Sequence, residues 1–236
     1  MQFRTLAAAA LMPMLALAAC DDNGNLTGIG GNDDDATVRF INATGTSLDI
    51  ATNGTVTTGN GALSYGTSSP CITTDAANSG LTVRETGTST ALPGFTPSFA
   101  ADGNYTVLIY PGTGGMTQFA TVSNAFTPTA GQAGLRVFNA AGNGTNYDVY
   151  VTAPAAALTT PNVNNVGFGS GSSYFNVGGA SAQQVRITNA GSQTVLLDFG
   201  NQTFTAGTNA TLVIAPPIPG STTPRAFLVQ GCPTTT

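Results

Sequence analysis

The chain has 236 residues, with 11 acidic and 6 basic side chains and no histidine, and only 7% of its residues are charged, against roughly 25% in an ordinary soluble domain. Without histidine, a Ser-His-Asp or Cys-His nucleophile system lacks its base, and neither a histidine-bearing nor a four-cysteine zinc site can be completed from three cysteines. Six scattered arginines in an acidic chain also suit a nucleic-acid backbone poorly. We therefore expect a scaffold or binding protein, not an enzyme, with no metal, no cofactor and no nucleic-acid partner.

The N-terminal segment has the three parts of an export signal. Arg4 supplies the positive charge, residues 6–18 are apolar, and small residues lead to Cys20. The apolar stretch is shorter than the roughly 20 residues that a membrane-spanning helix needs, so residues 1–19 are predicted to be a signal peptide.

Residues 17–20 read Leu-Ala-Ala-Cys and resemble the lipobox of bacterial lipoproteins. In that family the leader is removed before the cysteine, whose thiol receives a diacylglycerol, so the resemblance implies lipidation of Cys20 and attachment to the membrane through the lipid. Each buried methylene contributes about 0.8 kcal/mol, and more than one acyl chain gives stable anchoring. The expected location is the bacterial cell envelope, with the inner and outer membranes both open. An ordinary secretory signal with an incidental cysteine is the alternative.

Residues 20–35 are rich in Asp, Asn and Gly. This composition cannot bury enough apolar surface to order itself, so we predict a flexible tether between the lipid and the folded part. A calcium site at Asp33, Asp34 and Asp35 is the alternative, although consecutive aspartates lack the alternating ligand pattern of a calcium loop.

An internal repeat covers the rest of the chain. Val-Arg-Phe-Ile-Asn-Ala at 38–43 returns as Leu-Arg-Val-Phe-Asn-Ala at 135–140, and further matches follow in the same order, which indicates duplication of a unit of roughly 95 residues, a normal domain size. We place the two units at 36–130 and 131–232, followed by a short tail at 233–236.

Within each unit the apolar residues follow a period of two, which is typical of β-strands. Asn53-Gly54 predicts a tight hairpin, and residues 189–192 and 216–220 predict turns between later strands. Only residues 153–158 favour a helical turn. The sequence therefore predicts an all-β protein with two tandem β-sandwich domains.

Four motifs of the second unit identify a related family. They are Arg-Val-Phe-Asn-Ala at 136–140, Asp-Val-Tyr at 148–150, Phe-Gly at 168–169 and Val-Arg-Ile at 185–187. Each unit resembles the bacterial domain family numbered 4397 among the domains of unknown function, although the first unit lacks the tyrosine after Asp49-Ile50. The resemblance implies immunoglobulin-like sandwiches, often in tandem copies in envelope proteins, and no catalytic residues.

Charged residues recur at matching positions of the two units. Arg39 and Asp49 return as Arg136 and Asp148, although only 7% of the residues are charged. We expect an Arg39–Asp49 and an Arg136–Asp148 ion pair between the first two strands of each unit, which would mainly fix strand register. Independent solvated charges and ligand binding are the alternatives.

Cys71 and Cys232 remain once Cys20 is lipidated. Exported chains reach an oxidising compartment, which favours a disulfide. This bond would join the first unit to the end of the second and contribute up to about 5 kcal/mol in the chain-entropy model. Two free thiols are the alternative.

Three other features have both a chemical and a structural interpretation. The Gly-rich segment at 167–171 lacks the lysine and helix of a phosphate loop, which favours a strand-to-turn junction. The six tyrosines favour strand packing over a sugar-binding platform. A hydrolase would need two carboxylates to converge among Asp49, Glu85, Asp102, Asp148 and Asp198.

These observations predict a lipid-anchored, non-catalytic envelope protein that acts as a β-sandwich spacer or interaction module. The alternative is a lipoprotein that binds carbohydrate or another envelope polymer, and a carboxylate-dependent hydrolase is a distant third. Besides the membrane, the expected partner is an unidentified envelope polymer or protein.

Overall fold

The computed structural model describes residues 34–233. These residues form fifteen strands in four sheets and one short 3-10 turn, η1 (Thr113–Gly115), and the part of the chain described contains no α-helix. No helix there is long and apolar enough to span a membrane. The signal peptide, Cys20 and the predicted tether up to Asp33 lie outside the described residues.

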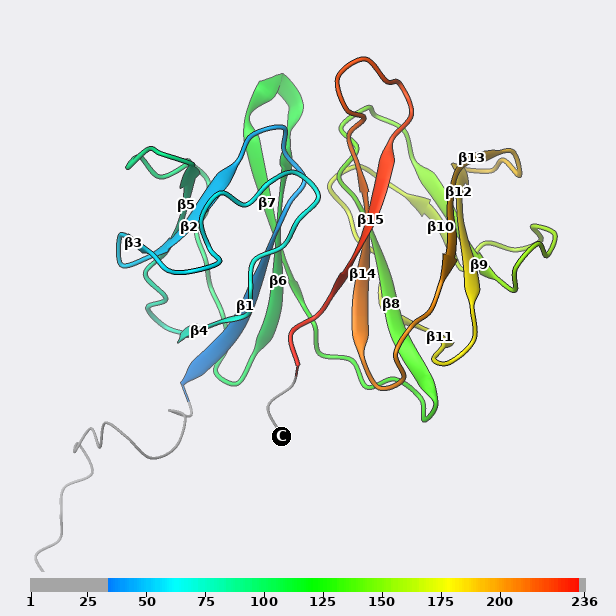
Figure 1. The fold of residues 1–236 in the computed structure, drawn as a ribbon, viewed down its shortest axis with the longest axis horizontal. Helices are drawn as coiled ribbons and strands as arrows, with labels where there is room; N and C mark the ends of the chain where they lie inside the picture. The colour runs from blue at the N-terminus through cyan, green and yellow to red at the C-terminus, as the bar shows by residue number, and fades with distance from the viewer. Residues whose placement is uncertain (1–33, 234–236) are drawn as a thin grey trace, which may run out of the picture. The chain divides into compact units, whose positions relative to one another are not determined.

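The first seven strands make a two-sheet sandwich (Figure 1). One sheet has the order β4-β1-β6-β7 and the other the order β3-β2-β5. Apolar side chains from both sheets share one core, which includes Phe40, Ile50, Val83 and Ile109. The strands are β1 (Asp35–Asn42), β2 (Leu48–Thr52), β3 (Thr55–Val56), β4 (Ile72–Asp75), β5 (Leu81–Glu85), β6 (Asn104–Pro111) and β7 (Thr117–Ser123).

The other eight strands make a second sandwich with its own core. Its sheets have the orders β11-β8-β14-β15 and β10-β9-β12-β13, and its core includes Leu135, Val149, Ile187 and Leu212. The strands are β8 (Gln132–Asn139), β9 (Tyr147–Thr152), β10 (Val163–Val166), β11 (Phe175–Gly178), β12 (Gln183–Asn189), β13 (Val195–Gln202), β14 (Asn209–Ala215) and β15 (Arg225–Gln230). The prediction of an all-β protein built from β-sandwiches is confirmed, while the immunoglobulin-like topology stays a prediction.

One sheet of each sandwich is buried on both faces. On β1, Val38 and Phe40 point into the first core, whereas Ile41 belongs to a third apolar cluster that also contains Phe138 and Val213 of the second sandwich. Because successive side chains of a strand point to opposite faces, this two-sided burial explains the nearly continuous apolar runs of these strands. The third cluster joins the two sandwiches.

The first hairpin has the turn that its sequence predicts. Asn53 and Gly54 have φ angles of 49° and 80°, the left-handed conformation that a two-residue hairpin between β2 and β3 requires, and the hairpin prediction is confirmed.

Residues 153–158 form a turn and not a helix. The predicted tether ends one residue too late, because Asp35 already pairs with Asp75 as the first residue of β1.

Candidate functional site: the junction between the two sandwiches

The third apolar cluster, which we call the junction core, holds the doubly buried sheets together. Aromatic rings contact one another across it: the ring centroid of Tyr110 lies 5.4 Å from that of Phe138 and 5.6 Å from that of Phe168. Edge-on aromatic pairs of this kind contribute about 0.5–1.5 kcal/mol beyond the area that they bury. The buried members of the junction core are Ile41, Ala43, Leu108, Tyr110, Phe138, Ala140, Val213, Ala215 and Val229.

Two arginines at the edge of the junction core make equivalent contacts, each from its own sandwich to a backbone carbonyl of the other. Arg39 on β1 donates from Nη1 to the backbone carbonyl of Gln230, at the end of β15. Arg136 on β8 donates from Nη1 to the backbone carbonyl of Ser123, at the end of β7, over 2.7 Å. Each sandwich therefore donates a hydrogen bond to the end of the other's last strand, a reciprocal arrangement like that between the two subunits of a symmetric dimer.

Two asparagines repeat this reciprocal arrangement. Asn104 is the first residue of β6 and donates from Nδ2 to the carbonyl of Cys232 over 2.9 Å. Asn209 is the first residue of β14 and donates from Nδ2 to the carbonyls of Asn124 and Phe126, over 3.1 and 2.8 Å. The chain segments that leave β7 and β15 are thereby fixed to the opposite sandwich.

The environment of Arg136 is aromatic and polar. Its Nε donates to Thr211 Oγ1 over 2.9 Å and its Nη2 to Asn124 Oδ1 over 2.7 Å, while the guanidinium carbon lies 4.8 Å from the ring centroid of Tyr174. Tyr174 in turn stacks on Phe126, with centroids 5.2 Å apart. Arg136 is only 4% exposed, and this burial lowers the pKa of its guanidinium, an effect that Tyr174 opposes. Hydrogen bonds and the ring face stabilise the buried cation.

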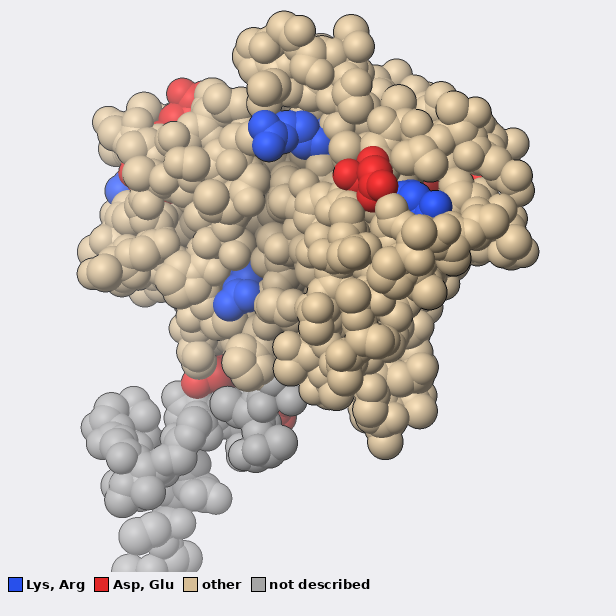
Figure 2. Space-filling view, turned by 45° about the vertical axis from the view of Figure 1, so that its right-hand side comes forward, with Lys and Arg blue, Asp and Glu red and all other residues tan. Residues whose placement is uncertain are grey.

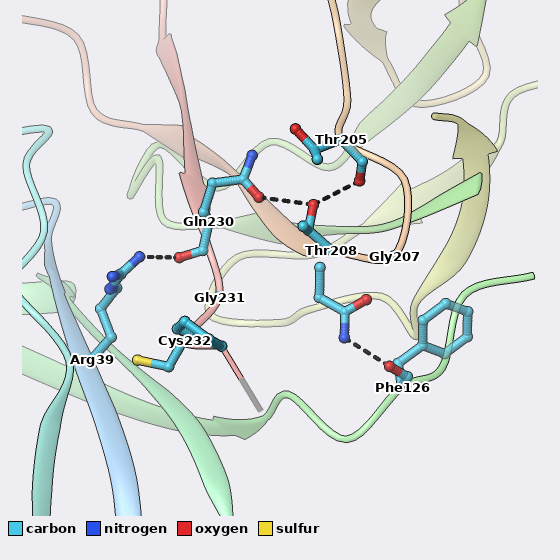
Figure 3. Close-up of a pocket in the computed structure, with 10 residues that line it drawn as sticks. Arg39, Phe126, Thr205, Gly207, Thr208, Gln230, Gly231 and Cys232 are labelled. Carbon is cyan, nitrogen blue, oxygen red and sulfur yellow. Dashed lines mark hydrogen bonds between the residues drawn. The ribbon is translucent and has the colours of Figure 1, made fainter. Parts of the chain in front are cut away.

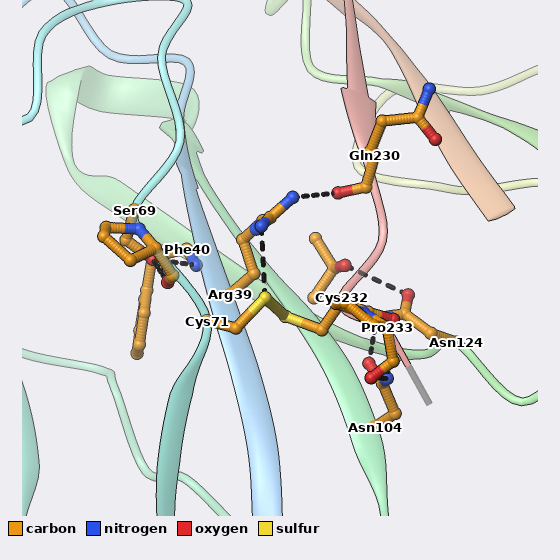
Figure 4. The surroundings of a disulfide bond; sticks show 11 residues. Arg39, Phe40, Ser69, Cys71, Asn104, Asn124, Gln230, Cys232 and Pro233 are labelled. Carbon is orange, nitrogen blue, oxygen red and sulfur yellow. Dashed lines mark hydrogen bonds between the residues drawn. A yellow bond between two sulfur atoms is a disulfide. The ribbon is translucent and has the colours of Figure 1, made fainter. Parts of the chain in front are cut away.

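A disulfide occupies the corresponding place beside Arg39. Cys71 and Cys232 are bonded, with their Cα atoms 5.8 Å apart, and Arg39 donates from Nη2 to Cys71 Sγ over 3.1 Å (Figure 4). Cys71 directly precedes β4, just as Tyr174 directly precedes β11. The structure thus contains the cysteine pair predicted from the sequence, and the covalent bond lies at the junction of the two sandwiches.

The two predicted ion pairs do not form, and the described residues contain neither an Arg39–Asp49 nor an Arg136–Asp148 bridge. The first two strands of each unit lie in opposite sheets, not side by side in one sheet. The arginines point away from their cores toward the junction. Stacked sheets lie about 10 Å apart, so the aspartates of the facing sheets are out of reach.

The two aspartates instead bind backbone amides of the loops beside them. Asp49 accepts hydrogen bonds from Ala62 N, Thr86 Oγ1 and Gly87 N, over 2.8, 3.0 and 3.4 Å. These bonds, chiefly that of Ala62, lower the pKa of the Asp49 carboxyl, and Arg84 adds to the effect, whereas burial opposes it. A carboxylate held ionised in this way is a poor general acid.

Asp148 repeats this role in the second sandwich. It accepts from the backbone amides of Asn165 and Gly191, over 2.7 and 2.8 Å. Asn165 and its counterpart Ala62 both have positive φ angles, 53° and 51°, which is uncommon outside glycine. The repeated aspartate therefore stabilises a backbone segment of uncommon conformation in each sandwich, which is a loop at Ala62 and the irregular part of β10 at Asn165.

The six tyrosines considered for a sugar-binding platform pack against other side chains of the folded protein. Three of the six tyrosines are almost fully buried, and each of the remaining three packs against a phenylalanine. Among residues 34–233, no group of three or more Cys, Asp or Glu side chains has metal-binding geometry, and Asp33 of the calcium alternative is not described. The six tyrosines are Tyr65, Tyr105, Tyr110, Tyr147, Tyr150 and Tyr174.

Two cavities lie near these features. One, of about 520 Å³, borders the junction and is lined by residues that include Arg39, Asn209, Gln230 and Cys232 (Figure 3). The other, of about 490 Å³, lies over the Gly-rich segment at 167–171 and is lined by Asn162, Asn164, Asn165, Ser170, Ser172 and Ser173 among others. Neither has a carboxylate in its lining, and Figure 2 shows how few charged side chains lie on the face it presents.

The junction core and the reciprocal arginine contacts were not predicted from the sequence. The signal for them was the apolar run on both faces of residues 38–43 and 135–140, combined with one arginine in each run. A strand that is apolar on both faces needs a second covering layer, and in this chain the other sandwich supplies it.

Residues 36–150 match the model of a family described as a domain of unknown function, DUF4397. The match supports this domain family over the first sandwich and extends through β8 into β9 of the second. The description of the family states no activity. None of the curated proteins compared with the chain matches it.

Proposed function

We propose that the protein is a lipid-anchored, non-catalytic component of the bacterial cell envelope, in which two copies of the domain form one rigid spacer or interaction module. The observation that supports it most is the junction, where an apolar core, reciprocal hydrogen bonds and a disulfide connect the two sandwiches. Domains that move independently are usually joined by smaller and more polar interfaces. A module of this kind keeps a fixed distance between the end of the flexible tether and whatever it binds.

The location rests on two independent features of the chain. The disulfide fits an oxidising compartment outside the cytoplasm, and the Leu-Ala-Ala-Cys sequence at 17–20 resembles a lipobox. The absence of histidine from the chain and the occupation of Asp49 by backbone donors favour a non-catalytic role.

Anchoring is tested by changing the predicted lipid site. In bacteria that express the full chain, Cys20→Ala is expected to abolish incorporation of labelled fatty acid and to move the protein from the membrane to the soluble fraction. Thr121→Ala on the exposed part of β7 serves as the control, because it also replaces a small polar side chain by alanine but leaves Cys20 and the disulfide intact. Membrane association of the Cys20→Ala protein equal to wild type would refute the anchor.

A polymer-binding role is the second candidate, and the cavity over residues 167–171 favours it. Its lining of amide and hydroxyl side chains carries no charge, as expected of a site that hydrogen-bonds a neutral sugar. Binding on a glycan array that is lost in Asn164→Ala, but retained after Thr121→Ala on the exposed part of β7, would support this role over that of a spacer.

A further inference from the structure

The disulfide lies between a positive charge and a cavity. Arg39 donates from Nη2 to Cys71 Sγ over 3.1 Å, and both Arg39 and Cys232 line the cavity of about 520 Å³ (Figure 3). The Nε of Arg39, on the same edge of the guanidinium as Nη2, is buried and has no hydrogen-bond partner. One edge of the arginine therefore has unused capacity to bind a negative charge on Cys71.

We infer that the Cys71–Cys232 bond is a thiol–disulfide exchange site for a dithiol reductant, with Cys71 as the leaving thiolate. One thiolate of the reductant attacks Cys232 Sγ from the cavity, so that a mixed disulfide forms with Cys232 as the bond to Cys71 breaks. The electron pair of the broken bond stays on Cys71 Sγ beside Arg39. The second thiol of the reductant then displaces Cys232, and the reductant leaves as its own disulfide.

The direction of attack follows from the charges around the two sulfurs. A thiol with a lower pKa leaves faster in exchange, and a neighbouring arginine lowers the pKa of a thiol. Arg39 contacts Cys71, whereas Cys232 is held through its backbone carbonyl by the neutral Asn104. The other polar side chains that line the cavity, Thr205, Thr208, Asn209 and Gln230, are also neutral, so Arg39 is the charge that acts on Cys71.

The exchange leaves the two sandwiches associated. The junction core and the Arg136 contacts do not involve either cysteine, so reduction releases only the covalent tie of the C-terminal segment. The inference rests on the disulfide and Arg39 and is independent of the lipid anchor at Cys20.

The rate of reduction of the full-length protein by dithiothreitol tests the inference. Arg39→Met is expected to slow reduction roughly five- to tenfold, because Cys71 loses its stabilising charge. Arg39→Lys is expected to remain within about threefold of wild type, and Arg225→Met, at an exposed position, is the control. Alkylation of Cys232 is followed by mass spectrometry after cleavage at arginines, which separates Cys232 from Cys71 in each protein. An Arg39→Met rate equal to or faster than wild type, in protein with the circular dichroism spectrum of wild type, would overturn the inference.

A second measurement keeps the test decisive if Arg39→Met folds poorly, because loosening of the fold would speed up reduction. In Cys232→Ser, with Arg39 intact, the pH dependence of Cys71 alkylation is expected to have a midpoint well below the ordinary thiol pKa of about 8.5. A midpoint at or above that value would exclude Cys71 as the favoured leaving group.

Discussion

Arg39 and Arg136 are counterparts across the junction, and each donates to the carbonyl at the end of the other sandwich's last strand, Gln230 for Arg39 and Ser123 for Arg136. Their strands have the same parallel register, since Arg39 lies opposite Thr106 and Arg136 opposite Thr211. The two sandwiches thus meet as the subunits of a two-fold dimer would. The two arginines differ in their neighbours: Arg39 lies beside the disulfide, and Arg136 lies over Tyr174, which stacks on Phe126.

Removal of the Arg136 cation is expected to weaken the junction. Arg136→Met keeps much of the aliphatic stem but leaves Ser123 O and Asn124 Oδ1 without their charged donor, at a cost of about 1–3 kcal/mol of unfolding free energy. Urea unfolding followed by circular dichroism measures the change. Arg225→Met, at an exposed position, should change stability by less than about 0.5 kcal/mol, and an equal loss in both variants would contradict the role of Arg136.

Loss of the disulfide is expected to lower stability without unfolding the protein. The Cys71→Ser, Cys232→Ser double variant should lose about 2–5 kcal/mol, because the unfolded chain regains the freedom of a 161-residue separation. A reductant should lower the unfolding free energy of wild type, in the same measurement, and leave that of the double variant unchanged. A double variant as stable as the oxidised wild type would contradict this prediction.

The junction core is expected to make the two sandwiches unfold together. Wild type should give one calorimetric transition, with equal calorimetric and van't Hoff enthalpies. Leu108→Asp places an unpaired charge in the junction core, where Leu108 is fully buried, and should split the transition in two. Thr121→Asp on the exposed part of β7 is the control, and two transitions in wild type would show that the sandwiches are independent.

Asp49 is expected to stabilise the protein at neutral pH and to lose this effect in acid. Its pKa is lowered in the folded state, chiefly by the bond from Ala62 N. The stabilisation is therefore complete above the unfolded pKa of about 3.9 and is lost as pH falls through the folded value. Asp49→Asn should cost about 1–3 kcal/mol at pH 7 and markedly less at pH 3.

Unfolding free energies of wild type and Asp49→Asn at the two pH values check this prediction. Glu85→Gln is the matched control, because Glu85 is an exposed carboxylate on β5 and its loss should matter little at either pH. A cost of Asp49→Asn that stays the same at pH 3 would show that the carboxylate charge does not contribute.

The sequence predicted the strands, the hairpin at Asn53-Gly54 and the cysteine pair because each depends on local chemistry or on the compartment. The prediction of the two ion pairs was wrong because adjacency along the chain does not determine which sheet a strand joins. Arg39 and Asp49 are on consecutive strands, yet β1 and β2 belong to facing sheets. The retained charges do have repeated roles, but their partners are loop amides and strand-end carbonyls that no charge pattern reveals.

The sequence also does not determine which residues of β7 and β15 are equivalent. Alignment by residue type pairs Phe119 with Phe227, but the strand register makes Ala226 the counterpart of Phe119, since they pair with the equivalent Ile214 and Ile109. Phe119 packs on the first sandwich core and Phe227 on the junction core. A shift of one residue reverses the face of a strand, so only the structure distinguishes core from junction.

Intact-mass analysis of the protein isolated from bacterial membranes measures signal cleavage, acylation and the disulfide in one experiment. The expected product begins at Cys20, carries covalently bound fatty acyl groups, and gains two hydrogens on reduction of the Cys71–Cys232 bond. A product that retains residues 1–19, carries no acyl group and has Cys71 and Cys232 as free thiols would contradict both the anchor and the covalently closed junction.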